Sequence, residues 1–254
     1  PRPNLSRLLK GRGSYADDVK LPRMVHVAFL RSPLAHADIV KIETDKASSA
    51  TGVIAVYNGK DLSKVCSPWV GVVTHLEGMR SPPQNLLAVD RVRWQGEPVV
   101  AVVAQTRALA EDAIELIEIK YEELPLAVDM KTALDDDAEV IHKEYENNLC
   151  WERNVNAGDV DSAFAEADVI VEEEFQFGRH TGVTLESRSI VADYDPGEEM
   201  LTLYQSTQAP HMKQALFAKH LELDEHKIRI ICRDVGGAFG LKAHAYGDEF
   251  ATAA

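Results

Sequence analysis

Residues 97–125 follow the pattern of a strand, a helix and a second strand in direct succession, and this pattern constrains the fold more than any other part of the chain. Val99–Ala104 is a continuous apolar run with the length of a buried strand. Thr106 stands where a helix cap is expected. Apolar residues then recur at helical spacing, at Ala110, Ala113, Ile114 and Ile117. "IEIKYEEL" closes the unit as a strand, so the sequence predicts a layered fold of helices and sheet.

Shorter patterns on both sides extend this mixture. "MVHVAFLRS" alternates as a half-buried strand does, and "TGVIAVYNGKDL" is predicted to be a strand that ends in a turn at Asn58-Gly59. In the second half, Asp159 is placed to cap a short helix that ends near Ala167. A strand with alternating faces is predicted to follow that helix, through Phe177.

The remaining patterns complete a second mixed layer. "SIVADYDPGEEMLTLYQSTQ" predicts two strands joined by a turn at residues 195–197. "STQAPHMKQALFAKHL" predicts a helix, with Thr207 as a cap candidate and Pro210 in the first turn, where its missing N–H does no harm. "KIRIIC" predicts a last strand. An acidic, irregular stretch, "ALDDDAEVIHKEYENN", separates the two halves and predicts a domain boundary.

Charge and cysteine usage argue against several functional classes. The formal net charge of −14 argues against a nucleic-acid partner, which would call for clustered Lys and Arg. Cys66, Cys150 and Cys232 are far apart, so we expect reduced cytoplasmic thiols and no zinc ribbon or iron–sulfur cluster held by this chain. No apolar run reaches the roughly 18 residues of a transmembrane helix. The missing initial Met and the Ala-rich end predict that the sequence is a fragment.

Three glycines, Gly236, Gly237 and Gly240, stand within five residues in "RDVGGAFGLK", directly after the last predicted strand. Their spacing matches neither the dinucleotide-binding nor the P-loop fingerprint. Successive N–H groups in such a run can converge on an anionic oxygen. A tight turn without a ligand explains the glycines equally well. The residues alone leave both interpretations open.

Two other stretches contain candidate site residues. Gln208 lies at or just inside the start of a predicted helix, where its amide can donate a hydrogen bond without adding charge. Glu186 and Arg188 are two residues apart, which places them on one face of a strand. A structural ion pair or network is the favoured account of that pair. The nine histidines form no metal-binding motif.

In this order, the stretches resemble the molybdenum-binding large subunit of the xanthine dehydrogenase, aldehyde oxidase and carbon monoxide dehydrogenase family. "GRGSYADDVKLPRMVHVAFLRSPLAHADI" and "DRVRWQGEPVVAVVAQTRALAEDAIELIEIKYEELP" resemble its hammerhead-type domain. "GDVDSAFAEADVIVEEEF", "LESRSIVADYD", "STQAPH" and "VGGAFGLK" resemble the start of its molybdopterin-binding region. The resemblance implies an α+β fold. Its parts would be a hammerhead-type α/β domain at residues 1–127, an acidic connecting segment at 128–150, and an incomplete molybdopterin-binding domain at 151–254.

The resemblance also implies a cofactor site. Gln208 would hydrogen-bond the oxo ligand of the molybdenum, and no side chain of the protein would ligate the metal directly. The small glycines would let a bulky anionic complex lie against the main chain. The general-base glutamate of the family would lie beyond residue 254, so this fragment alone is expected to be inactive. The implied cofactor-binding set is Gln208, Gly236, Gly237, Ala238, Phe239 and Gly240.

The implied cofactor is molybdopterin with molybdenum, in its cytosine dinucleotide form. A medium subunit with FAD and a small subunit with two 2Fe-2S clusters would be the partners. The implied reaction oxidises an aldehyde, an N-heterocycle or a similar small electron-poor substrate, with water as the oxygen source. Purine-oxidising members carry an acid after the lysine of the glycine motif, but Ala243 stands there in this chain, which argues against xanthine or hypoxanthine.

Two alternatives remain open. The chain could be a non-catalytic scaffold that keeps this fold and has lost the cofactor. It could also be a phosphate-binding α/β domain that uses the glycine run alone and holds no metal.

Overall fold

The strand predicted from the apolar run Val99–Ala104 is the centre of the first sheet. The computed structural model describes residues 3–71 and 76–254. In it, β5 (Pro98–Ala104) lies between β1 (His26–Arg31) and β3 (Val53–Asn58), antiparallel to both. Helix α4 (Arg107–Ile114) packs on this sheet, and its N-cap Thr106 accepts a hydrogen bond from Leu109 N. The predicted succession of strand, helix and cap is confirmed.

A second three-stranded sheet has the order β4-β2-β6, with both outer strands antiparallel to β2. Its strands are β4 (Arg91–Val92), β2 (Ala37–Glu43) and β6 (Glu118–Glu123). Two one-turn helices, α2 (Asp45–Ser48) and α3 (Gly59–Leu62), flank β3. The turn predicted at Asn58-Gly59 is wrong in detail: Asn58 caps α3, because its side chain accepts hydrogen bonds from the backbone N–H groups of Lys60 and Asp61.

The third sheet belongs to the second half of the chain and has the order β7-β8-β9. β7 (Ile190–Asp195) and β8 (Met200–Gln205) form a hairpin, and α6 (Pro210–Leu221) then leads to β9 (Ile228–Ile231), which pairs with β8 in parallel. Pro210 is the first helical residue, as predicted, but Ala209 and not Thr207 is the N-cap. Thr207 Oγ1 instead accepts from Ala209 N and donates to the carbonyl of Lys242.

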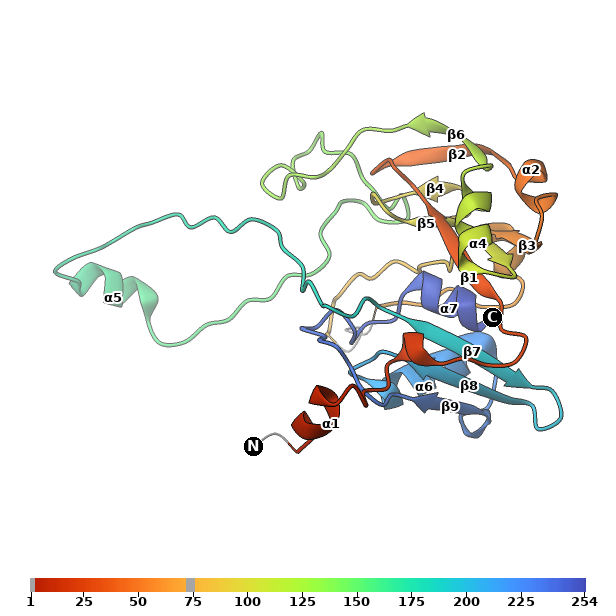
Figure 1. Cartoon of the computed structure of the whole chain (residues 1–254). Helices are drawn as coiled ribbons and strands as arrows, with labels where there is room; N and C mark the ends of the chain where they lie inside the picture. The colour runs from red at the N-terminus through yellow and green to blue at the C-terminus, as the bar shows by residue number, and fades with distance from the viewer. Residues whose placement is uncertain (1–2, 72–75) are drawn as a thin grey trace.

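One apolar core joins the two halves. Phe250 of α7 (Gly247–Ala253) is fully buried, with its ring centroid 5.1 Å from that of Trp69 and 4.7 Å from that of Phe217. Ala101 of β5 belongs to the same cluster of buried residues. Helix α7 therefore lies between the first two sheets and the third, as Figure 1 shows. The short α1 (Leu5–Leu9) and a 3-10 turn at residues 16–18 precede the sheets.

Residues 126–189 contain a single short helix, α5 (Val160–Glu166), whose N-cap Asp159 accepts from Ser162 N as predicted. The strand predicted after α5, through Phe177, is wrong: residues 168–177 form no strand. They pair with no strand within the described ranges, and their apolar side chains are exposed. Figure 1 shows α5 and the segments on both sides of it as a long loop that extends away from the three sheets. Within residues 3–71 and 76–254, no helix has the length and apolarity to cross a membrane.

Candidate functional site

The fold brings Gln208 and the glycine run together. The run follows β9 and returns toward the end of β8, where Gln208 N donates a 3.3 Å hydrogen bond to the carbonyl of Lys242. Thr207 Oγ1 donates to the same carbonyl at 3.0 Å. Gln208 lies just before α6 and not within it. Gln208 and Lys242, at the end of the glycine run, are 34 positions apart in the sequence and meet here through their backbones.

Both motifs face outward at this point. Gln208 is exposed, and Phe239 is 78% exposed. The backbone of Phe239 has a φ of +48° and that of Gly240 a φ of +88°, so two successive residues occupy the left-handed region. The Phe239 ring thus lies open on the surface formed by the described residues. Gln208, Phe239 and Gly240 are thus exposed residues of two segments that meet at the Lys242 carbonyl.

The backbone surroundings of Gly236, Gly237 and Gly240 differ, and each favours glycine for a different reason. A Cβ on Gly236 would lie 2.5 Å from the Cβ of Glu186, so a protein side chain already occupies that space. Gly237 has a φ of +99°, and a Cβ there would lie 3.2 Å from the Phe239 ring. Around Gly240 nothing lies within 4 Å of the Cβ position. The position of a Cβ is therefore open at Gly240, whereas at Gly236 the Glu186 side chain occupies it.

Glu186 is the anchor of the run. Its Oε2 accepts hydrogen bonds from Gly236 N at 2.7 Å, Ser206 Oγ at 2.7 Å and Lys242 Nζ at 2.9 Å. Lys242 is fully buried and also donates to Ser206 Oγ at 2.7 Å. Burial opposes the ionisation of Glu186, but these hydrogen bonds and the charge of Lys242 outweigh it and hold the pKa of the carboxyl below its usual value.

The strand that would place Glu186 and Arg188 on one face is not formed, since residues up to Ser189 precede β7. The two side chains also have different partners, so the prediction of a network holds only in part. Arg188 makes two 2.7 Å hydrogen bonds to the two carboxylate oxygens of Asp248, and its guanidinium lies 3.9 Å from the Tyr246 ring centroid. Sequence reasoning missed the partners of Glu186 and Arg188, because they are far away along the chain. They are Ser206, Gly236 and Lys242 for Glu186, and Asp248 for Arg188.

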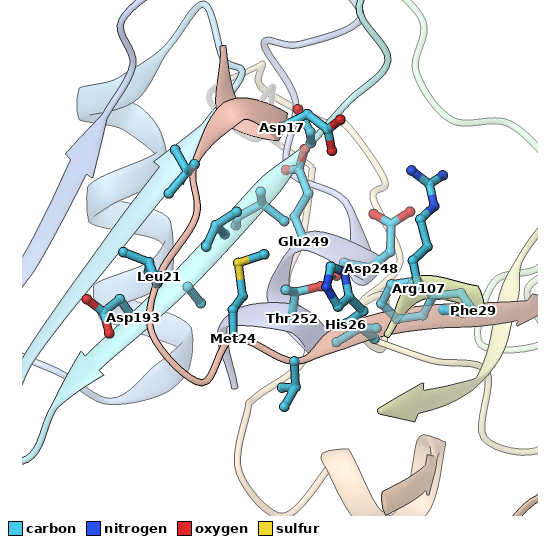
Figure 2. A pocket seen from close by; sticks show the side chains of 18 of the residues that line it. Asp17, Leu21, Met24, His26, Phe29, Arg107, Asp193, Asp248, Glu249 and Thr252 are labelled. Atoms are coloured by element: carbon cyan, nitrogen blue, oxygen red, sulfur yellow. Dashed lines mark hydrogen bonds between the residues drawn. The ribbon is translucent and has the colours of Figure 1, made fainter. Parts of the chain in front are cut away.

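A second charged cluster lines a cavity of about 650 Å³ between the segment before β1, β7 and α7. Figure 2 shows Asp248, Glu249 and Thr252 on α7 beside Met24 and His26. Lys213 Nζ donates to Glu249 Oε2 at 2.7 Å, and both residues are buried. Burial lowers the pKa of Lys213 and raises that of Glu249, against their mutual attraction. Neither Gln208 nor the glycine run lines this cavity. The cluster is thus separate from the surface formed by those two motifs.

In the part of the chain that the structure describes, no three His, Cys, Asp or Glu side chains gather in a way that could hold a metal ion. The fold and the site together define a mixed α+β protein in which an exposed Gln208 is joined through its backbone to the end of a glycine-rich turn. Residues 10–125 match the family model of the aldehyde oxidase and xanthine dehydrogenase a/b hammerhead domain, and residues 141–254 match that of the molybdopterin cofactor-binding domain. The chain belongs to the xanthine dehydrogenase and aldehyde oxidase family of molybdenum-binding large subunits.

Curated relatives agree with this membership. The chain is 38% identical to the nicotine 6-hydroxylase large subunit of Paenarthrobacter nicotinovorans, over 98% of this chain and 30% of the relative. It is 35% identical to the carbon monoxide dehydrogenase large chain of Afipia carboxidovorans, over 94% of this chain and 30% of the relative. The chain thus spans about 30% of the length of these relatives.

Among solved structures, quinoline 2-oxidoreductase from Pseudomonas putida 86 superimposes with a TM-score of 0.93 at 36% identity, covering 99% of this chain and 32% of that one. The aldehyde oxidoreductase of Desulfovibrio gigas superimposes with a TM-score of 0.89 at 25% identity, covering 99% of this chain and 28% of that one. The expected α+β fold and the expected family are confirmed.

Proposed function

We propose that this chain is part of the cofactor-binding subunit of a molybdenum hydroxylase, and that Gln208 and the glycine run contact the cofactor. The observation that carries the proposal is the hydrogen bond from Gln208 N to the Lys242 carbonyl, because it joins the backbone of Gln208 to the end of the run. The proposed contacts are Gln208, Gly236, Gly237, Ala238, Phe239 and Gly240. The domains proposed are the hammerhead-type domain at 1–127, a connecting segment at 128–150 and the molybdopterin-binding part at 151–254.

The residues present fit such a group. Gly240 leaves open space beside its backbone, and Gln208 offers an amide donor that carries no charge. Glu186 Oε1 is buried and has no hydrogen-bond partner within the described ranges, so it can accept one more donor at the base of the run. When bound, the molybdenum cofactor would supply two-electron oxidation of the substrate, with water as the source of oxygen. This chain's part would be to bind and orient the cofactor.

The substrate class we propose is an N-heterocycle, an aldehyde or a similar small electron-poor molecule. Nicotine 6-hydroxylase and quinoline 2-oxidoreductase, by their names, act on heterocycles, and both are similar to this chain over nearly its whole length. Ala243 follows Lys242, where an acid would be expected in a purine-oxidising relative. An uncharged methyl at that position offers no hydrogen bond to a purine, which supports the non-purine classes.

The cytosine dinucleotide form of the cofactor is proposed on the same likeness. So are a medium partner subunit with FAD and a small one with 2Fe-2S clusters. Relatives described as a large subunit or a subunit of a complex support the existence of partners. A cytoplasmic location is proposed because Cys66, Cys150 and Cys232 are all free thiols.

The test uses the full-length subunit produced with its partners. We expect molybdenum and pterin in a constant ratio to protein, and reduction of the enzyme by quinoline or an aldehyde without oxygen. The Gln208→Ala variant should slow turnover about 10–100-fold, because a hydrogen bond to a charged acceptor is lost. Its melting temperature should stay near that of the wild type, since Gln208 is exposed. Gln105→Ala, which also removes an exposed carboxamide, is the control and should change neither.

Purification of the stoichiometric complex without molybdenum or pterin, under conditions that load related enzymes, would overturn the proposal. A Gln208→Ala variant that turns over like the Gln105→Ala control would remove Gln208 from the site. A protein that loads no cofactor but assembles normally would instead be the non-catalytic scaffold.

A further inference from the structure

The glycine run is held from both ends by one carboxylate. At its start, Gly236 N donates to Glu186 Oε2 at 2.7 Å, and Glu186 N donates to the Gly236 carbonyl at 3.2 Å. The two residues are thus joined by two hydrogen bonds in opposite directions. Their backbones lie so close that a Cβ on Gly236 would overlap the Glu186 side chain. Any other residue at position 236 would therefore force this pair apart.

Lys242 closes the other end of the run. Its Nζ, fully buried, donates to Glu186 Oε2 at 2.9 Å and to Ser206 Oγ at 2.7 Å. Its carbonyl accepts from Thr207 Oγ1 and Gln208 N. One residue thus ties the end of the run to the anchoring carboxylate through its side chain, and to Gln208 through its backbone. Between the two anchors, only the tip of the run is left exposed, at Phe239 and Gly240.

Such an arrangement is not needed to close a turn. A buried lysine loses hydration that only a well-placed partner offsets, and a neutral side chain would fill the same space without that loss. What the ion pair adds is a fixed position for both ends of the run, because Oε2 is shared by Gly236, Ser206 and Lys242. The shared oxygen thereby fixes the distance between the glycine run and Gln208. The proposed cofactor would bind across this distance.

We propose that Glu186, paired with Lys242 and bonded to Ser206, is a positioning residue that sets the shape of the glycine run for the cofactor. This inference rests on the proposed function. Glu186 need not touch the cofactor through the oxygen that holds the run. It acts through the backbone of Gly236 and through Lys242, so its loss should loosen the run before it affects the rest of the fold.

The experiment compares Glu186→Gln and Lys242→Met with a matched control, Lys213→Met, in the full-length subunit with its partners. Lys213 is equally buried, and pairs with Glu249 at 2.7 Å away from the glycine run. All three variants should lower the melting temperature, because each leaves a buried ionic or polar group poorly paired. Only the first two should lower the molybdenum and pterin content per subunit, by about tenfold, as loss of a supporting residue does in metal sites.

A second measurement does not depend on the cofactor. In the cofactor-free subunit, amide hydrogen exchange of residues 235–242 should become faster in Glu186→Gln and stay at the wild-type rate in Lys213→Met. If Lys242→Met does not fold, Ser206→Ala replaces it, because that change removes one hydroxyl from the same shared oxygen. Its exchange and cofactor content should shift in the same direction by a smaller factor.

The double variant Glu186→Gln/Lys242→Met removes both buried charges and supplies a rescue test. It should melt at a higher temperature than either single variant, while its cofactor content stays low, because the shared anchor is still missing. If Glu186→Gln retains wild-type cofactor content and wild-type exchange in residues 235–242, the inference is wrong and the proposed function stands. If the wild-type complex itself holds no molybdenum, the proposed function fails, and the exchange result alone decides whether Glu186 shapes the run.

Discussion

Strand β5 and residues 168–177 both have sequence patterns that predict a strand, yet only β5 is one. β5 pairs with a strand on each side, and Val99, Val100 and Val102 are completely buried. In residues 168–177, Val169, Val171, Phe175 and Phe177 are about four-fifths exposed, at 78%, 80%, 80% and 82%. The two regions differ in their surroundings and in their charge, because residues 168–177 include Asp168 and the acids at 172–174, whereas β5 has no charged side chain.

The difference shows what a strand requires. Backbone N–H and C=O groups of an extended chain need partners on a neighbouring strand, and an apolar face needs another layer to cover it. β5 has β1 and β3 as partners and α4 above it, whereas residues 168–177 have neither within the described part of the chain. An apolar pattern therefore predicts the ability to pair, and the remainder of the fold decides whether pairing occurs.

The largest effect is expected from a charge in the centre of β5. In Val102→Asp, a carboxylate would replace a fully buried side chain in the apolar cluster that includes Val92, Val99 and Val100. We expect a loss of about 4 kcal/mol or more in the free energy of unfolding, or failure to fold. Urea unfolding followed by circular dichroism measures this. A cooperative transition within 1 kcal/mol of the wild type, as a rough bound, would show that β5 is not the centre of the core.

A smaller effect is expected at Glu97, next to β5. Burial raises the pKa of its carboxyl from the ordinary value of 4.5 to about 7, although it accepts a hydrogen bond from Arg93 N. The folded state therefore binds the proton more tightly than the unfolded state. Its contribution to stability is full below pH 4.5 and is lost as the pH rises to about 7.

The Glu97→Gln variant should therefore be more stable than the wild type at pH 8. The gain should approach about 3 kcal/mol, the size of such a pKa shift, and should shrink toward zero near pH 4.5. Gln keeps an oxygen that can accept from Arg93 N. Urea unfolding of both proteins at the two pH values gives the difference. An equal gain at both pH values would mean that Glu97 does not titrate differently in the folded state.

Two helix caps sharpen the comparison further. Thr106 caps α4, which packs on the first sheet, and Asp159 caps α5, which has no buried residue. Thr106→Ala should lower the free energy of unfolding by about 1 kcal/mol. Asp159→Ala removes the same kind of hydrogen bond but should leave the global unfolding transition unchanged, because α5 is not part of the cooperative core. Equal losses from the two substitutions would contradict the contrast between the two regions.

The smallest effect on stability is expected in residues 168–177, where the apolar side chains are exposed. The double variant Val169→Asp/Val171→Asp should change the free energy of unfolding of the 254-residue chain by less than about 0.5 kcal/mol. Both side chains already face solvent, so no buried contact is lost. Urea unfolding is again the measurement, with Val102→Asp as the positive control. A loss above about 1 kcal/mol would mean that this segment packs on the body of the protein.

The candidate site was predictable only in its parts. The glycines and Gln208 are visible as local features, and the resemblance to a family placed them in one site. Their contact at the Lys242 carbonyl could not be read from spacing, because it depends on how β8, α6 and β9 are packed. The role of Glu186 was missed for the same reason. Its partners Ser206, Gly236 and Lys242 are 20, 50 and 56 residues away in the sequence.

Local sequence alone determined a layered mixture of helices and strands, the central strand β5 with its capped helix α4, and the positions of β7, β8, α6 and β9. Periodicity, caps and turn residues act over a few neighbours, so they are readable without coordinates. Only the tertiary structure decided that residues 168–177 stay unpaired and that Asn58 caps a helix. It also decided that the Glu186 side chain fills the space beside Gly236. Each of these depends on groups brought together from distant parts of the chain, and no local pattern encodes which groups those are.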